Sequence, residues 1–235
     1  MNQEKALVWF RRDLRDHDHA ALSAALSNAR EVHCAFIFDT DILDALPSRQ
    51  DRRVQFIRES LVELDAALRA RGGGLIVRHG RASEEIPNLA RDASVYANRD
   101  YEPAAKARDA AVAENLEALG IAFHTRKDQA IFDGDDVLTQ AGRPFSVFTP
   151  YKNAWLKRLT SADYAEWSWR GKLAPCASAA VPRLDQIGFA PTDLEQLGIR
   201  PGMSGARALW EEFRNGRMAR YGALRDFPAI KGVSY

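Results

Sequence analysis

The sequence predicts an α/β fold: a doubly wound, mostly parallel five-stranded sheet, followed by an irregular linker and a short helical piece. Two observations support this fold class. First, five apolar runs alternate with stretches in which hydrophobic residues recur at helical spacing, as expected of a parallel sheet with helices on both faces. Second, residues 174–201 carry four prolines and few regular apolar steps, which is typical of an interdomain linker.

The strands are predicted from the apolar runs. The first, residues 6–10, reads Ala-Leu-Val-Trp-Phe without a polar interruption, as in a strand buried on both faces. Further strands are expected at residues 32–38, 75–78, 94–97 and 121–125. Together they form the sheet of a Rossmann-like domain.

Helices are expected between these strands, at residues 20–29, 47–71, around 86–92, and 104–120. Leucines, valine and isoleucine at three- and four-residue steps predict the buried face of the long second helix. Gly72-Gly73-Gly74 is expected to end it. This triple glycine is not a dinucleotide-binding loop, because it follows a helix and precedes a strand.

Polar loops follow two of the predicted strands. Residues 11–19, Arg-Arg-Asp-Leu-Arg-Asp-His-Asp-His, come directly after the first strand, and residues 98–103 follow the fourth. In open α/β sheets, ligands bind at the carboxyl ends of the strands, so both loops are candidates for a site. The alternative for residues 11–19 is a surface loop whose Arg and Asp side chains pair with each other.

Metal and hydrolase chemistry are disfavoured. Asp39, Asp41 and Asp44 lack a glycine-containing calcium loop, so turn and helix-capping roles are expected for them. The five histidines show no ligand spacing beyond His17-x-His19, and no Gly-x-Ser-x-Gly elbow is present. No metal site is predicted.

The composition fits one globular domain with an extension, or two small domains: 235 residues, of which 46% are hydrophobic. Two cysteines, Cys34 and Cys176, make no disulfide framework, which together with the lack of a signal-peptide region predicts a cytoplasmic location. No apolar run is long enough to span a membrane. Residues 151–235 hold 13 Lys and Arg against 8 Asp and Glu, so this part is the better candidate to contact a polyanion.

Residues 145–159 connect the two parts of the chain and predict a basic amphipathic helix. Pro150 fits its first turn, while Lys152, Lys157 and Arg158 lie off the apolar face. The alternative is a helix packed on the sheet with solvated cations. Trp167-Ser168-Trp169-Arg170 is expected to be exposed, and residues 205–221 to be helical.

Four motifs, in order along the whole chain, resemble the DNA photolyase and cryptochrome family, most closely the N-terminal half of bacterial class I cyclobutane pyrimidine dimer photolyases. They are Val-Trp-Phe-Arg-Arg-Asp-Leu-Arg at residues 8–15, Asp-Arg-Arg-Val at 51–54, Val-Phe-Thr-Pro-Tyr at 147–151, and Tyr221 with Arg-Asp-Phe-Pro at 225–228.

The resemblance implies three segments. Residues 1–140 would be the α/β antenna domain, residues 141–204 the amphipathic helix and interdomain linker, and residues 205–235 the start of a truncated, all-helical FAD-binding domain. In this family light excites reduced FAD, which splits pyrimidine dimers flipped out of damaged DNA. The parent protein would thus be a deoxyribodipyrimidine photo-lyase, with no catalytic residue inside this chain, which we expect to be inactive in repair alone.

The resemblance also implies site residues for FAD. Tyr221 matches a position that contacts FAD, and Val233, Ser234 and Tyr235 match the start of the loop that holds its phosphates. Val233 replaces a common threonine, so it can offer only its N–H. The alternative for Tyr221 is ordinary helix packing.

For the antenna chromophore, the resemblance points to Arg53, Asp100, Ala104 and Ala105. Folate-binding relatives carry an Asn-Glu pair where this chain has Ala104-Ala105, which removes two polar contacts to methenyltetrahydrofolate. Asp100 and Arg53 match deazaflavin-binding relatives better. FMN, FAD or an empty pocket stay open, and Asp100 could instead cap a helix.

For damaged DNA, the candidate phosphate contacts are Arg225, Lys152, Lys157 and Arg158, although an ion pair with Asp226 is the alternative for Arg225. No membrane partner is implied, and a monomer is expected. Two other readings stay open: a cryptochrome-type blue-light photoreceptor and a stand-alone chromophore-binding module. We expect residues 205–230 to be frayed in the isolated chain.

Overall fold

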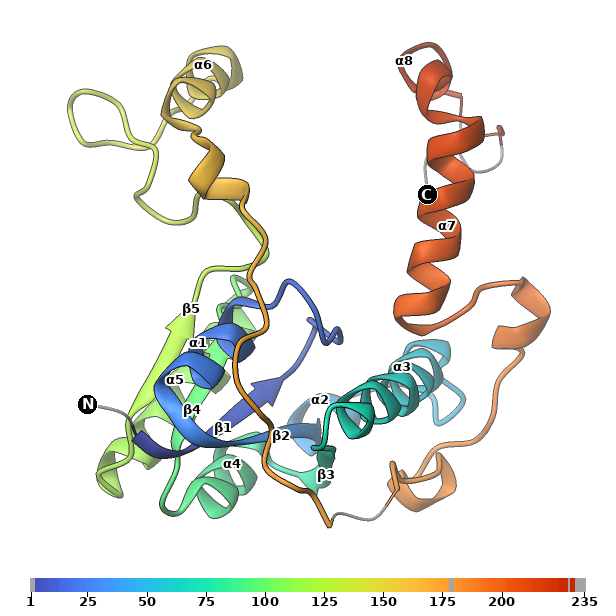
Figure 1. The fold of residues 1–235 in the computed structure, drawn as a ribbon. Helices are drawn as coiled ribbons and strands as arrows, with labels where there is room; N and C mark the ends of the chain where they lie inside the picture. The colour runs from blue at the N-terminus through green and yellow to red at the C-terminus, as the bar shows by residue number, and fades with distance from the viewer. Residues whose placement is uncertain (1–2, 178–179, 228, 231–235) are drawn as a thin grey trace.

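The computed structural model describes residues 3–177, 180–227 and 229–230. Its centre is a five-stranded sheet in the order β3-β2-β1-β4-β5, and all four neighbouring pairs are parallel (Figure 1). The strands are β1 (Gln3–Phe10), β2 (Ala29–Asp39), β3 (Leu75–Gly80), β4 (Ser94–Asn98) and β5 (Phe123–Arg126). The predicted five-stranded parallel sheet is therefore confirmed.

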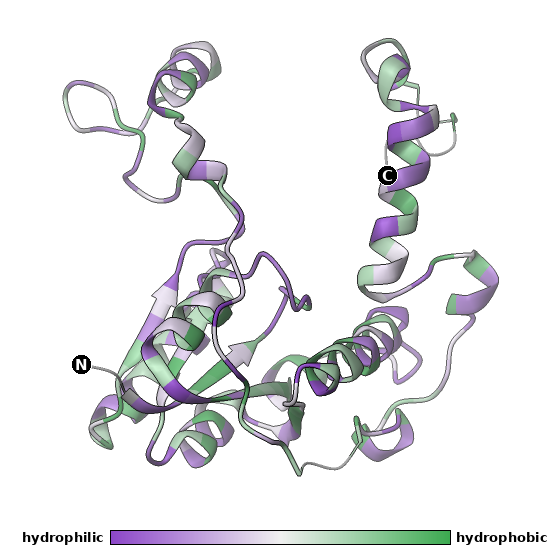
Figure 2. Ribbon diagram, viewed as in Figure 1, coloured by the Kyte–Doolittle hydropathy of each residue, from purple (hydrophilic) through white to green (hydrophobic). Residues whose placement is uncertain are grey.

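Helices cover both faces of the sheet: α1 (Ala20–Asn28), α3 (Arg52–Ala70), α4 (Ala82–Ala90) and α5 (Pro103–Ala118), with a short α2 (Thr40–Leu43) after β2. The alternation of side chains in β1 separates two cores. Val8 and Phe10 pack with α1 and α3, whereas Leu7 and Trp9 pack with α4 and α5. This arrangement is the doubly wound fold that the sequence predicts, and Figure 2 shows its apolar strands beside the hydrophilic loop after β1.

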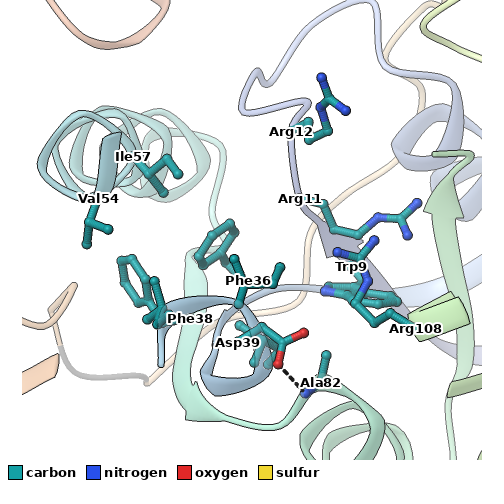
Figure 3. Close-up of a pocket in the computed structure, with 13 residues that line it drawn as sticks. Trp9, Arg11, Arg12, Phe36, Phe38, Asp39, Val54, Ile57, Ala82 and Arg108 are labelled. Carbon is teal, nitrogen blue, oxygen red and sulfur yellow. Dashed lines mark hydrogen bonds between the residues drawn. The ribbon is translucent and has the colours of Figure 1, made fainter. Parts of the chain in front are cut away.

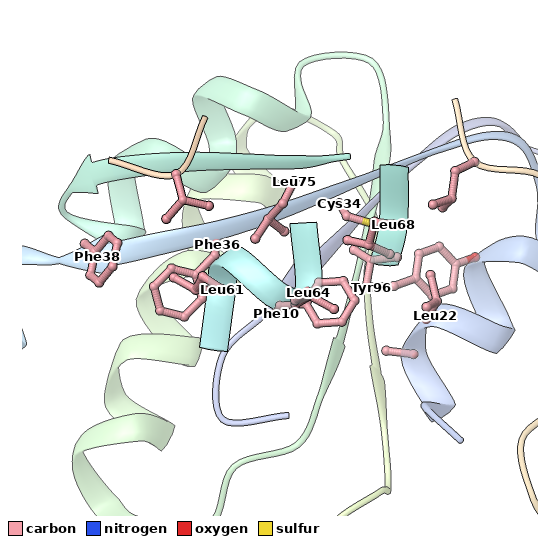
Figure 4. Close-up of a cluster of buried hydrophobic side chains, with 14 of the residues drawn as sticks. Phe10, Leu22, Cys34, Phe36, Phe38, Leu61, Leu64, Leu68, Leu75 and Tyr96 are labelled. Atoms are coloured by element: carbon pink, nitrogen blue, oxygen red, sulfur yellow. The ribbon is translucent and has the colours of Figure 1, made fainter. Parts of the chain in front are cut away.

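The α3 leucines at three- and four-residue steps form the larger core. Leu61, Leu64 and Leu68 are fully buried and lie against Phe10 and Phe36 of the sheet (Figure 4). The helix begins at Arg52, later than residue 47, because Asp51 caps it by accepting the N–H of Arg53. At its end Gly72 adopts φ +86°, a conformation that favours glycine.

The strand order has a direct consequence for where a ligand can bind. The chain goes from β1 outward to β3 and then returns to place β4 on the other side of β1. The loops after β1 and β4 therefore separate to opposite faces at the carboxyl edge of the sheet, which creates a crevice at this edge.

After β5 the chain leaves the sheet through residues 127–147 and forms α6 (Phe148–Arg158), which projects away from the α/β part (Figure 1). Pro150 lies in its first turn, as predicted. No residue of α6 is buried in the described part of the chain, so the alternative of a helix packed on the sheet is wrong. Its tertiary ring contact is between Trp155 and Phe132, with centroids 5.4 Å apart.

The linker is irregular, as expected, with short 3-10 turns at Ser161–Tyr164, Asp185–Ile187 and Leu194–Leu197. It is nevertheless packed along the α/β part, with Leu173, Val181 and Phe189 buried in the larger core. The prediction that residues 167–170 are exposed is wrong for Trp169, which is partly buried because its ring stacks under the guanidinium of Arg71, 4.1 Å away.

The chain then forms α7 (Gly202–Gly216), a 3-10 turn at Met218–Arg220 and α8 (Tyr221–Leu224). The predicted helix 205–221 thus starts earlier and ends earlier. Residues 202–216 form a continuous helix, which differs from the expectation of a frayed segment over 205–230. Figure 1 shows α6 and α7 rising on opposite sides, separated from each other.

Candidate functional site

A cavity of about 150 Å³ lies at the carboxyl edge of the sheet (Figure 3). Segments far apart in the sequence form it: the ends of β1 and β2, the helices α2 and α3, the start of α4, and α5. Its lining residues are Trp9, Arg11, Arg12, Phe36, Ile37, Phe38, Asp39, Ile42, Leu43, Val54, Ile57, Ala82 and Arg108.

The cavity walls are mainly aromatic and aliphatic, whereas its polar side carries three guanidinium groups, those of Arg11, Arg12 and Arg108. Its one acidic lining residue is Asp39, whose carboxylate accepts hydrogen bonds from the N–H groups of Asp41 (3.2 Å) and Ala82 (3.3 Å). Burial raises the pKa of Asp39. Its role as the cap of α2 confirms the turn and capping prediction for this aspartate.

Two of the arginines stack on the floor of the cavity. The guanidinium carbons of Arg11 and Arg108 lie 4.7 Å and 5.1 Å from the centroid of the Trp9 ring. Both arginines pair with Asp109, and Arg108 also lies 3.8 Å from Asp100. These ion pairs hold the two cations against the indole ring.

Arg12 is different because its side chain is 54% exposed. It pairs with Glu102 (2.8 Å) and lies 3.4 Å from Asp100. Arg11, Arg12 and Ile57 also line a second hollow of about 690 Å³, on whose far wall α7 places apolar side chains and Arg207. The first cavity therefore opens towards a larger space between the β1 loop and α7.

A buried polar network supports the β1 loop beneath the cavity. The His19 Nδ1 atom accepts the N–H of Leu22 at the start of α1, so Nε2 carries the proton that faces Asp13 at 2.8 Å. Asn98, at the end of β4, donates to Asp13 at 2.6 Å and accepts from the N–H of Ala21. Residues 11–19 are thus an organised loop in which Asp13, Asp16 and His19 are buried, rather than only a surface loop of paired charges.

A family model described as DNA photolyase matches residues 6–168. The chain belongs to the DNA photolyase family. It is 31% identical to a deoxyribodipyrimidine photo-lyase of Synechococcus over 97% of this chain and 49% of that protein. A cryptochrome DASH of Natronomonas pharaonis is 32% identical over 92% of this chain and 45% of its own length. The chain therefore spans about half the length of these relatives.

Solved structures agree with this assignment. A bacterial class III photolyase from Agrobacterium tumefaciens superposes with a TM-score of 0.80 and 26% identity, covering 99% of this chain and 49% of the other. An archaeal photolyase from Sulfolobus tokodaii, described with two FAD molecules and a novel light-harvesting cofactor, has a TM-score of 0.66 and 27% identity over 80% of this chain and 42% of its own. This photolyase-family chain thus corresponds to the N-terminal half of both.

The residues predicted for the antenna chromophore are only partly brought together. Asp100 is buried beside Arg12 and Arg108, and it does not cap α5, because the capping position is Glu102 and Asp100 accepts the N–H of Tyr101 instead. Ala104 is exposed and Ala105 buried, and neither lines the cavity. Arg53 pairs with Asp51 and lines a separate hollow beside residues 191–193.

The residues predicted for FAD and DNA lie far from this cavity. Tyr221 is exposed on α8, with its ring 5.8 Å from that of Phe213. Arg225 is 3.8 Å from Asp226, which agrees with the ion-pair alternative. Val233, Ser234 and Tyr235 lie outside the described residues.

On α6, Lys152 and Lys157 are exposed, while Arg158 lies over the Phe132 ring and donates to the carbonyl oxygen of Asp136. Within the described ranges, no group of His, Cys, Asp and Glu could hold a metal ion. Among the helices that the structure describes, none is both long and apolar enough to cross a membrane.

Sequence reasoning missed Arg108, His19 and Asn98 as parts of this edge. His19 and Asn98 lie inside the loops that the sequence singled out, so their position was the available signal. In the sequence, Arg108 looks like an ordinary solvent-exposed cation on a helix. The packing of α5 against β1 brings it to Trp9.

Proposed function

We propose that this chain is the antenna half of a light-driven, FAD-dependent photo-lyase that splits cyclobutane pyrimidine dimers. The observation that carries the proposal is the cavity at the carboxyl edge of the sheet, with aromatic walls and three guanidinium groups. Residues 1–140 form the antenna domain, residues 141–204 the amphipathic helix and linker, and residues 205–235 the start of the helical domain.

The residues present fit an antenna chromophore. Trp9, Phe36 and Phe38 offer flat apolar surface to a conjugated ring, and the guanidinium groups suit an anionic edge or tail. The cavity alone is smaller than most ligand pockets, which measure roughly 300–1,000 Å³. The adjoining 690 Å³ hollow supplies the additional space for the rest of the ligand.

A bound antenna chromophore would supply light absorption and pass its excitation to the flavin. The chain's own residues would bind and orient it: Phe36 and Phe38 as apolar walls, Arg11 and Arg108, stacked on Trp9 and held by Asp109, and Arg12 at the opening. The antenna is a deazaflavin or methenyltetrahydrofolate, and FMN and FAD are further candidates. Asp100, beside Arg12 and Arg108, supports the deazaflavin assignment.

The catalytic FAD is assigned to a different place from the antenna cavity. Tyr221 alone of the four predicted FAD residues is described, and it lies exposed on α8. Since the chain spans about half the length of its relatives, we assign catalytic flavin binding, and with it repair, to the rest of a parent protein, and expect this chain to be inactive in repair by itself. Damaged DNA would be contacted mainly there, with Lys152, Lys157 and Arg225 adding phosphate contacts.

A cryptochrome-type photoreceptor is the second candidate, supported by the similarity to a cryptochrome DASH over 92% of this chain. Expression of the parent gene in a repair-deficient strain separates the two. Survival of ultraviolet-treated cells under visible light supports the photo-lyase, and a lack of rescue by a folded, flavin-containing protein rejects it. A monomer in the cytoplasm stays a prediction for either candidate.

The antenna assignment is tested with the purified chain, incubated separately with a deazaflavin, methenyltetrahydrofolate and FMN. After gel filtration, one chromophore is expected to stay bound with a red-shifted absorption band. A folded chain that stays colourless in all three cases, and again after incubation with FAD, would reject the antenna site. That result would leave the assignment of the chain to the family fold unchanged.

A further inference from the structure

The attachment of α7 to the rest of the molecule depends on its first turn. Gly205 is buried and Met203 packs against the larger core, whereas from Ala206 onward the helix is mostly exposed (Figure 1). The direction of α7 is therefore decided by the few contacts at this turn.

The start of α7 has no cap of its own. The residue in the N-cap position is Pro201, which offers no side-chain hydrogen bond. Two residues of α3 take over this role. Ser60 Oγ accepts the N–H of Gly202 at 3.0 Å, and the Glu63 carboxylate accepts both the N–H and the hydroxyl of Ser204, at 2.8 Å and 3.0 Å.

The backbone around this contact allows little adjustment. Gly202 has φ +84°, and a Cβ atom there would lie 2.0 Å from Glu63 Oε2. A Cβ atom on Gly205 would lie 2.0 Å from the carbonyl oxygen of Arg200. Two glycines thus let the first turn of α7 close directly onto the Glu63 side chain and onto its own preceding loop.

We propose that Glu63 is a positioning residue: its carboxylate, shared between the backbone and side chain of Ser204, sets the direction in which α7 leaves the α/β part of the chain. This inference rests on the proposed function: in the parent protein, the contact would fix the position of the helical domain relative to the antenna cavity. Excitation transfer falls steeply with distance and depends on the relative orientation of the two chromophores, so a loose joint would lower its efficiency without emptying either site.

The proposal is tested by the distance between spin labels on α5 and α7, measured by double electron–electron resonance in this chain without any chromophore. Cysteines replace Glu117 and Arg214, both exposed, in a Cys176→Ser background; Cys34 is buried. The parent chain and Glu63→Gln, which keeps an acceptor oxygen, are expected to give one narrow distance peak. In Glu63→Ala the distribution of distances between the two labels is expected to become broad.

Control variants separate positioning from helix stability. Val62→Ala changes the exposed neighbour of Glu63 and is expected to keep the narrow peak. In Glu63→Ala with Ser204→Asp, an acidic residue in the first turn restores α7 by itself. Circular dichroism should then show the helix while the distances remain broad. A narrow peak in either Glu63→Ala variant would overturn the proposal, and neither result depends on whether the cavity binds a chromophore.

Discussion

The His19 Nε2 atom lies 2.8 Å from a carboxylate oxygen of Asp13, and both side chains are almost completely buried. Burial by itself favours the neutral form of Asp13, but His19, the N–H of Arg11 and the Arg11 charge outweigh it, and the pKa of Asp13 is lowered. The hydrogen bond from His19 Nε2–H to the Asp13 carboxylate thus stabilises the loop that carries Arg11 and Arg12 to the cavity.

Asp13→Asn should destabilise the chain by about 1–3 kcal/mol, because its amide N–H₂ replaces one of the oxygens that face His19, Asn98 and the N–H of Arg11 and leaves a buried donor unsatisfied. Urea unfolding followed by circular dichroism measures the loss. Asp92→Asn, which removes an exposed ion pair with Lys5, serves as the control and should change stability far less. Equal losses in both variants would contradict a special role for the buried pair.

The lowered pKa of Asp13 also predicts a pH dependence. A carboxyl group with a depressed folded-state pKa contributes stability above its unfolded value of about 3.9, and this contribution is lost as pH falls through the folded pKa. The difference in unfolding free energy between the parent chain and Asp13→Asn should be constant near neutral pH and shrink below about pH 4. A difference in unfolding free energy that grows on acidification would contradict a lowered pKa of Asp13 in the folded chain.

Arg12 and Arg53 form a matched pair of exposed arginines, of which only Arg12 lines the cavity. Arg12→Gln should weaken binding of an anionic chromophore about tenfold, because one charge-assisted contact is lost. Arg53→Gln should leave the affinity unchanged, as measured by fluorescence titration with FMN or a deazaflavin. A weaker affinity in Arg53→Gln with an unchanged affinity in Arg12→Gln would place the chromophore in the hollow beside Arg53, where the family resemblance implies a contact.

Gly73 lets the linker pack on the end of α3. A Cβ atom at this position would lie 2.6 Å from the Leu173 Cβ atom, so Gly73→Ala should cost about 1–3 kcal/mol by overpacking. Gly216→Ala, in α7 with open space around it, is the control and should not destabilise. Thermal unfolding of the two variants tests this difference, and an unchanged midpoint for Gly73→Ala would contradict the close packing.

Lys152 and Lys157 are exposed on α6 and are available to phosphates. In the parent protein, replacing both with glutamine should reduce the salt dependence of damaged-DNA binding by about one unit of slope per lost phosphate contact. Lys106→Gln on α5 is the control, since it changes an exposed lysine outside α6. An unchanged slope for the double variant would remove α6 from the DNA interface.

The strands and helices could be predicted from the sequence because each depends on a local pattern of apolar residues. The family motifs could be read directly from the sequence. The apolar run from Ala6 to Phe10 needs burial on both faces, and the leucines of α3 need one buried face. The prediction for Trp169 failed because a long-range contact with Arg71 covers its ring. The predicted start of α3 was too early because a local cap, in which Asp51 accepts the N–H of Arg53, decides where the helix begins.

The sequence alone was sufficient for the α/β class, the family resemblance and the two loops at the carboxyl edge. The tertiary structure was needed to bring Arg108 and Ala82 beside Trp9, to exclude Arg53 from the cavity, and to attach α7 through Glu63. The physical reason is that periodicity reports which side of an element is buried. Which partners meet there depends on the strand order β3-β2-β1-β4-β5 and on helix packing between residues distant in the chain.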